Sequence, residues 1–231
     1  MDTERCVYVS QPACWAPGLV TNDDWVLWAE GKKQVSLTGD APKLEFTTPL
    51  FRRRLSQISR MTVQVVHDII EKTKSDAKPL SECKQIFTSL RGEISKEFEI
   101  NRQIIQDNEI LPAAFSLSVF NTPMALATIA LGLKAGYSVV YPSKGNFNYA
   151  LTAAAAPLLC KDEEKIIFVY ADELIPPQYN AVAEATEPFA FALAMSANID
   201  EECNIKLNPQ SKELCTPKDA LSYILTRSKI T

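Results

Sequence analysis

The sequence predicts an α/β fold built on a five-stranded, mixed and mainly parallel sheet with helices on both faces. Strand-like apolar runs alternate with helical patterns, as crossover connections between parallel strands require. The run Lys165–Asp172 is apolar almost throughout, which is typical of a strand buried on both faces. No linker rich in Pro, Ser or Gly divides the 231 residues. We therefore expect a single domain over residues 1–231, with 198–231 as a C-terminal extension.

Residue type and periodicity place the individual elements. Short runs rich in β-branched and aromatic residues predict strands. The predicted strands are Cys6–Ser10, Cys83–Leu90, Phe115–Val119, Lys165–Asp172 and Phe189–Ser196, with a short extended piece at Tyr137–Tyr141. Apolar residues at helical spacing predict helices over residues 21–31, 50–74, 93–105, 120–136, 147–160 and 217–227. The longest helix, 50–74, has no Gly or Pro within its apolar pattern.

The central feature is the joint at which the predicted strand Phe115–Val119 runs directly into a helix rich in small residues. Such a joint lies at the positive end of the helix dipole, so enzymes often place a nucleophile there. Here it carries Phe120, Asn121 and Thr122, and none of these is an obvious nucleophile. We expect Asn121 to cap the helix through its side-chain oxygen rather than to contact a ligand.

Charge and the chemistry-bearing residues exclude several functions. A net charge of −4, with one tight basic cluster at Arg52–Arg54, argues against nucleic-acid binding. The six cysteines have no metal-like spacing, and a single histidine, His67, excludes a multi-histidine zinc site. We predict no cofactor and no metal. The sequence shows neither a signal-peptide pattern nor an apolar run long enough to span a membrane, so we expect a cytoplasmic protein.

Several motifs together resemble β-ketoacyl synthases. Residues 119–130 align without gaps with the synthase segment that contains the catalytic cysteine, and Phe120 takes the place of that cysteine. The stretch Phe115–Asn121 is similar to the Phe-Ser-Leu-Ser-Val-His-Asn of short proteins like the N-terminal synthase domain, and differs only at Phe120. Other matching motifs are Trp15–Gly18, Arg52-Arg53-x-x-Ser56-x-x-x-Arg60, Ser89–Glu93, Ala171–Glu173 and Pro176–Tyr179.

The resemblance covers residues 4–197 and implies one half of a thiolase-like fold. It also implies that the catalytic histidines belong to a second half, so neither the nucleophile nor its histidine partners are expected here. Phe120 is then either a gate on an acyl tunnel, as in chain-length-factor-like proteins, or a core aromatic that fills a vacated site. The basic cluster either docks an acidic acyl carrier protein or holds its own loop.

Two functions from different classes follow. The first is a non-catalytic partner in fatty-acid-like or aryl-polyene-type biosynthesis. It would bind a complete ketosynthase, or a second copy of itself, through an edge strand at Phe115–Val119, and possible contact with a carrier protein belongs to the same hypothesis. The alternative is an acyltransferase or hydrolase that uses another nucleophile, with Cys14, Cys160 and Ser118 as candidates. No Gly-x-Ser-x-Gly elbow supports the alternative.

Overall fold

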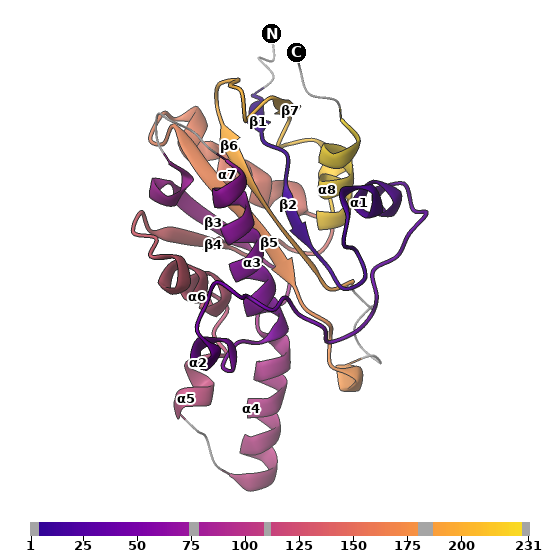
Figure 1. Ribbon diagram of the computed structural model, residues 1–231, viewed down its shortest axis with the longest axis vertical. Coiled ribbons are helices and arrows are strands. Elements are labelled where there is room, and N and C mark those ends of the chain that lie inside the picture. The colour runs from indigo at the N-terminus through magenta and orange to yellow at the C-terminus, as the bar shows by residue number, and fades with distance from the viewer. Residues whose placement is uncertain (1–4, 74–78, 109–111, 180–186, 228–231) are drawn as a thin grey trace.

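The computed structural model describes residues 5–73, 79–108, 112–179 and 187–227. One mixed sheet forms its centre, with helices on both faces (Figure 1). The strands are β1 (Val7–Val9), β2 (Ala13–Trp15), β3 (Lys84–Thr88), β4 (Tyr137–Val140), β5 (Lys165–Asp172), β6 (Phe189–Ser196) and β7 (Ile205–Leu207). Their order is β4-β3-β5-β6-β1-β7, and β2 pairs with the other end of β6.

The mixed α/β architecture of a thiolase-like half-domain is confirmed, with seven strands rather than five. Its parallel part is confined to β4, β3 and β5. The pairs β5–β6, β6–β1, β6–β2 and β1–β7 are antiparallel. The expectation of a mainly parallel sheet thus fits only the half that carries the crossover helices. The missed strands β2 and β7 have three residues each, too few for a period-two pattern.

Helices cover the two faces of the sheet with two separate apolar cores. The helices are α1 (Asn22–Ala29), α2 (Pro49–Arg52), α3 (Gln57–Lys72), α4 (Ile94–Asp107), α5 (Pro112–Phe115), α6 (Thr122–Leu131), α7 (Phe147–Leu159) and α8 (Pro217–Thr226). One core joins α3 and α6 to the sheet, and the other joins α1, α7 and α8 to the opposite face. Every residue of β6, and all of β5 except Lys165, is buried between them.

The predicted helix over residues 50–74 is two helices. Thr48 caps α2 and Ser56 caps α3, each by accepting a hydrogen bond from a backbone N–H one turn further on. The Arg60 guanidinium also donates to the Arg52 carbonyl across the break, at 2.8 Å. A serine inside a helical pattern offers the backbone an alternative partner, and here it starts a new helix.

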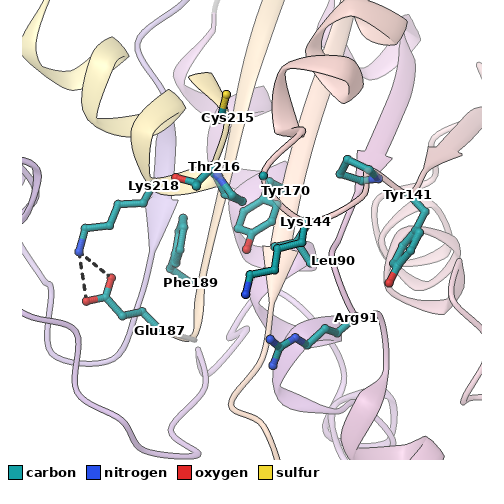
Figure 2. A pocket seen from close by; sticks show the side chains of 13 residues that line it. Leu90, Arg91, Tyr141, Lys144, Tyr170, Glu187, Phe189, Cys215, Thr216 and Lys218 are labelled. Atoms are coloured by element: carbon teal, nitrogen blue, oxygen red, sulfur yellow. Dashed lines mark hydrogen bonds and ion pairs between the residues drawn. The ribbon is translucent and has the colours of Figure 1, made fainter. Parts of the chain in front are cut away.

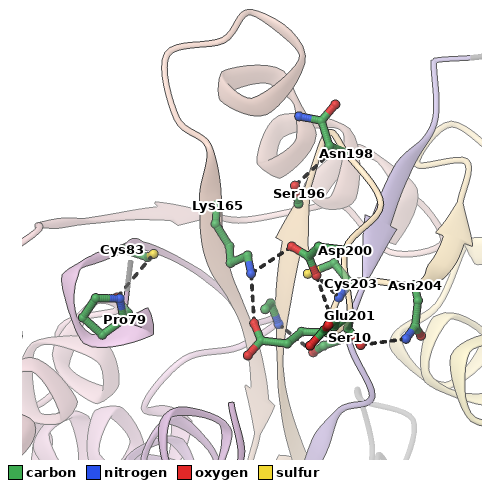
Figure 3. Close-up of polar contacts among 12 residues, drawn as sticks. Ser10, Pro79, Cys83, Lys165, Ser196, Asn198, Asp200, Glu201, Cys203 and Asn204 are labelled. Atoms are coloured by element: carbon green, nitrogen blue, oxygen red, sulfur yellow. Dashed lines mark hydrogen bonds and ion pairs between the residues drawn. The ribbon is translucent and has the colours of Figure 1, made fainter. Parts of the chain in front are cut away.

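Residues 198–227 are built into the sheet and its cover rather than trailing from them. β7 pairs with β1, and α8 packs against α1. The turn before β7 is held by Lys165, whose ammonium lies 3.0 Å from Asp200 and 2.9 Å from Glu202 (Figure 3). Asp200 also accepts from the backbone N–H groups of Glu202 and Cys203.

The predicted strand Phe115–Val119 is wrong. Phe115 ends the short helix α5, and residues 116–121 are a series of turns. Their hydrogen bonds are local: Ser116 donates to Pro112, Ser118 donates to Phe115, and Thr122 donates to Val119. The alternating pattern Phe-Ser-Leu-Ser-Val therefore lies beside the sheet instead of pairing with it. β4 is the edge strand on this side of the sheet.

Candidate functional site

Phe120 lies at the joint before α6 and is half-buried. Its ring meets Phe87 of β3 at 6.4 Å and Tyr141, just after β4, at 5.2 Å between centroids, the latter edge to face. Both are favourable aromatic geometries. The Phe120 side chain is thus held by aromatic contacts with the ends of two parallel strands.

Gly92 forms the floor beneath the Phe120 ring. Its φ of +61° is unfavourable for residues with a side chain. A Cβ atom on Gly92 would lie 2.7 Å from Cδ2 of Phe120, closer than packed atoms approach. The ring therefore rests directly on the backbone of the loop Ser89–Glu93, which we call the β3 loop. The aromatic ring of Phe120 therefore fills the space next to the joint.

Asn121 does not cap α6 through its side chain, contrary to expectation. Its Nδ2 donates instead to the Tyr137 hydroxyl of β4, at 2.9 Å. The Asn121 backbone already adopts a helical conformation, which turns the side chain away from the first helical N–H groups. Pro123, in the first turn, has no N–H that needs a partner. Asn121 thus links α6 to the edge strand.

Asp172, at the end of β5, holds the first half of the β3 loop. Its carboxylate accepts from the Ser89 hydroxyl at 2.5 Å and from the Tyr170 hydroxyl at 2.8 Å. It also accepts from the backbone N–H groups of Leu90 and Arg91. Burial raises the pKa of Asp172, while the hydroxyl and N–H donors act in the opposite direction. With so many donors directed at it, this carboxylate is a structural anchor for the loop.

Two further carboxyl groups hold the second half of the loop. Glu93 accepts a short hydrogen bond from the Ser59 hydroxyl of α3. Glu173 accepts from the backbone N–H of Ser95 at 2.9 Å and from that of Ile58 at 3.4 Å, in the first turns of α4 and α3. Burial, and then the nearby charge of Glu93, raise the pKa of Glu173 to about 7. The pair joins two helix N-termini, and the positive helix ends favour its negative charge.

The basic cluster divides into one structural arginine and two exposed ones. Arg52 donates to the backbone carbonyls of Lys43 and Leu44, at 3.3 and 3.0 Å, and so holds the preceding loop. The side chains of Arg53 and Arg54 are exposed. Arg52 thus holds its own loop, whereas the side chains of Arg53 and Arg54 are accessible.

The other candidate nucleophiles lie in different parts of the fold. Burial raises the pKa of the Cys14 thiol on β2, and the charge of Lys72 only partly opposes this. Cys160 is exposed at the end of α7, and the Ser118 hydroxyl donates to the Phe115 carbonyl at 2.9 Å. His67 stacks on Phe46 at 3.7 Å and contacts Asp68. The described residues contain no cluster of His, Cys, Asp and Glu that could hold a metal ion.

The fold is that of one half of a thiolase-like domain, and the aromatic ring of Phe120 lies at the joint before α6. The chain belongs to the family of the β-ketoacyl synthase N-terminal domain, whose model matches residues 25–223. No curated protein matches the chain significantly by sequence.

Solved structures with this fold include ketosynthase assemblies. A chain of the "Ketosynthase (ApeO) in Complex with its Chain Length Factor (ApeC) from Xenorhabdus doucetiae" is 21% identical, with TM-score 0.70, over 94% of this chain and 91% of that one. "The ishigamide ketosynthase/chain length factor" gives TM-score 0.66 at 12% identity, over 85% of this chain and 63% of that one. A type II acyl-carrier protein–ketosynthase complex, AntDE:AntF, gives TM-score 0.58 at 13% identity, over 84% and 64%. This chain thus spans just under two thirds of the second and third relatives. At these sequence identities, the matches establish a similar fold.

Sequence reasoning found the joint but missed the residues around it. Tyr137, Tyr141 and Gly92 contact the joint residues across gaps of 16 or more positions in the chain, and no local pattern signals such contacts. Ser89–Glu93 was singled out only as part of the resemblance. A glycine directly after a buried strand was the available sign of a close backbone approach.

Proposed function

We propose that this chain is a non-catalytic partner of a β-ketoacyl ketosynthase. The observation that carries the proposal is Phe120. It takes the place that the family uses for an acyl-accepting cysteine, and its ring fills the adjoining space down to Gly92. A phenylalanine ring at this position can neither accept an acyl group nor activate one for transfer. Likeness in fold to chains from ketosynthase–chain-length-factor complexes supports the same role.

The contact surface in this proposal is the apolar exposed part of α4, α5 and the turn after them. α4 extends away from the sheet with α5 beside it (Figure 1), and Ile100 is its only buried residue. Ile105 is 82% exposed, Phe115 56% and Val119 41%. Grouped apolar exposure of this kind marks interaction sites rather than ordinary surface. The turns at 116–121, which form no sheet pairing in this chain, lie beside these residues.

A carrier protein is the second partner in this proposal. Arg53 and Arg54 are the exposed part of the basic cluster, and an acidic carrier surface is their natural complement. Their contribution would be to attract and orient the carrier. A charged rim of this kind mainly changes the association rate and its dependence on salt.

The test is co-expression of the tagged chain with a complete β-ketoacyl synthase from the same organism, followed by affinity purification. The proposal expects a stable complex of one chain with one synthase subunit. The double variant Phe115→Asp with Val119→Asp should weaken it by roughly 10- to 100-fold, because it buries unpaired charge at the contact. Leu37→Asp, at a residue 57% exposed on a different loop, should leave it unchanged. Failure of the unmodified chain to co-purify would contradict the proposal.

A further inference from the structure

A pocket of about 600 Å³ lies at the carboxyl ends of the parallel strands. The β3 loop forms part of its wall, and the segment that follows β4 forms another part (Figure 2). The end of β5, the start of β6 and the start of α8 also contribute to the lining. Its volume falls within the range of small-molecule sites.

The topology favours a ligand site at this place by a general rule. The connection after β3 includes α6, on the sheet face shared with α3, and the connection after β4 is α7, on the opposite face. Adjacent parallel strands whose connections diverge in this way leave a crevice outside their carboxyl ends, and open α/β sheets bind ligands there. Residues from both diverging connections line the pocket.

The charged side chains of the lining are engaged in interactions within the chain. The Lys218 ammonium lies 3.2 Å from the Glu187 carboxylate and 5.1 Å from the centroid of the Trp28 ring. Glu187 also accepts a hydrogen bond from the indole N–H of Trp28, at 3.0 Å. Arg91 and Lys144 take part in interactions of their own. The described part of the lining therefore presents no charge that lacks an interaction.

The uncharged polar groups of the lining are also largely satisfied. The Tyr170 hydroxyl donates to Asp172 at 2.8 Å, and the Thr216 hydroxyl donates to Asp219 at 2.7 Å. The Cys215 thiol donates to a backbone carbonyl. A ligand that carried a charge into this pocket would lose its hydration among groups whose partners are taken, and that loss is costly. The lining thus disfavours a charged ligand.

The surface that remains for a ligand is aromatic and apolar. Tyr170 and Phe189 lie 5.0 Å apart between ring centroids and form one side of the pocket. Figure 2 places Tyr141, which is 66% exposed, at the other end of the lining. Leu90 and Pro217 add aliphatic surface. Aromatic side chains gain from edge-to-face or offset contact with a further ring, so these walls favour an aromatic ligand.

We propose that this pocket binds a small, uncharged aromatic molecule. The ring of the ligand packs against Tyr170 and Phe189 and contacts Tyr141. Its affinity comes from buried apolar area and ring geometry rather than from charge. The site needs no second subunit, so it stands or falls independently of the partner role.

The experiment titrates the purified full chain with matched probes by isothermal calorimetry. The neutral probe is coumarin-3-carboxamide, and its charged isostere is coumarin-3-carboxylate. The proposal expects one site per chain, with the carboxylate at least about 10-fold weaker because its charge is desolvated without an unpaired donor to receive it. Coumarin should also bind at least about 3-fold more tightly than octahydrocoumarin, which has the same ring skeleton without the aromatic ring.

A pair of exposed tyrosines supplies the variants. Tyr141→Ala removes one aromatic contact and should weaken binding of coumarin-3-carboxamide by about 3- to 10-fold. Tyr149→Ala, at a residue 64% exposed on α7 and outside the lining, is the matched control and should bind as the unmodified chain does. Both side chains are exposed, so neither substitution opens a cavity in the core.

Two cysteines show where the ligand binds without any substitution. Cys215 lines the pocket, whereas Cys160 is exposed outside it. Saturating coumarin-3-carboxamide should slow alkylation of Cys215 by iodoacetamide at least about 5-fold, because alkylation needs access to the thiol, and should leave Cys160 unchanged.

Four results would overturn the proposal: no binding of coumarin-3-carboxamide at millimolar concentration, equal or tighter binding of the carboxylate, normal affinity in Tyr141→Ala, or unchanged Cys215 alkylation at saturation. Equal affinity for coumarin and octahydrocoumarin would show that the pocket selects apolar bulk alone, and would contradict the aromatic class.

Discussion

The β3 loop, Ser89–Glu93, has a closed side and an open side. On one side Phe120 presses onto Gly92 and leaves no room for a Cβ. On the other, Leu90 and Arg91 border a pocket of about 600 Å³. Tyr141 belongs to both sides, since it contacts Phe120 and lines the pocket. The five residues of one loop thus separate the packed ring of Phe120 from an open cavity.

The difference shows that the framework of the loop does not depend on the ring that packs against one side of it. The loop is fixed from beneath by Asp172 on the open side and by Glu93 and Glu173 on the closed side. These contacts do not depend on what residue 120 is. A change of residue at position 120 would therefore leave the polar anchors of the loop in place.

The largest expected effect comes from Asp172→Asn, which would release the β3 loop on its open side. Every group that faces this carboxylate is a donor, and an amide NH₂ placed among them leaves buried groups unpaired. We expect the free energy of unfolding to fall by about 3–4 kcal/mol. Urea denaturation measures it. Tyr170→Phe removes one donor of the set and should cost only about 1 kcal/mol.

Gly92→Ala tests the closed side. A Cβ here meets both the unfavourable φ and the Phe120 ring at 2.7 Å, so we expect a loss of about 2–3 kcal/mol in the free energy of unfolding. Gly132→Ala is the matched control, with φ +66° and nothing within 4 Å of its Cβ, and should show only the backbone cost of about 1 kcal/mol.

Adding Phe120→Ala to Gly92→Ala should recover the steric part of that loss in a double-mutant cycle. Strict additivity of the two substitutions, or equal costs at positions 92 and 132, would show that the ring does not rest on Gly92.

Glu173 makes stability depend on pH on the closed side of the loop. Its pKa is raised from 4.5 to about 7, so the folded protein holds this proton more tightly than the unfolded chain does. The stabilisation is complete below about pH 4.5 and is lost as the pH rises through about 7. Over that window we expect a loss of about 3 to 4 kcal/mol, because the shift from 4.5 to about 7 corresponds to about 1.4 kcal/mol for each pKa unit.

Glu173→Gln removes the titrating proton, so its unfolding free energy should change less between pH 5 and pH 8 than that of the unmodified chain. Urea titrations at both pH values measure the two slopes. Glu45→Gln, at an exposed carboxylate, controls for the loss of one negative charge. Parallel pH dependence of the Glu173→Gln variant and the unmodified chain would refute the assignment.

The smallest expected effects distinguish the role of Arg52 from that of Arg53 and Arg54. Arg52→Ala removes two hydrogen bonds to backbone carbonyls and should cost about 1 kcal/mol of stability. The pair Arg53→Ala with Arg54→Ala should change stability by less than about 0.5 kcal/mol. It should instead slow association with the carrier protein about 3- to 10-fold at low salt, measured by surface plasmon resonance. A carrier on-rate unaffected by the pair would exclude these two residues from the docking site.

Sequence predicted the elements that carry strong periodicity or continuous burial. β5 and β6 lie at Lys165–Asp172 and Phe189–Ser196 as expected, and α7 and α8 differ from expectation by a residue at most. The failures lie where a tertiary partner outweighs the local pattern. Ser56 caps a helix inside an unbroken helical pattern, and Phe115–Val119 forms turns although its residues alternate like a strand.

The candidate site was predictable in part. The helix after residue 121 follows from the residues of 120–136, whereas the strand expected before it is absent and the role of Phe120 stays a prediction. The open pocket does not, because its walls come from five segments that meet only in the folded chain. Phe189 and Cys215, for example, carry no local sign of a cavity.

The described residues include no helix long and apolar enough to cross a membrane.

Acyl transfer to the intact protein tests the central claim most directly. The chain is incubated with an octanoyl thioester of N-acetylcysteamine at neutral pH, and its mass is measured without digestion. If Phe120 has replaced the acyl-accepting group, the mass remains that of the unmodified chain, whereas Phe120→Cys gains at most slow acylation because no histidine partner adjoins it. One octanoyl group added rapidly and stoichiometrically to a cysteine of the unmodified chain would contradict the account.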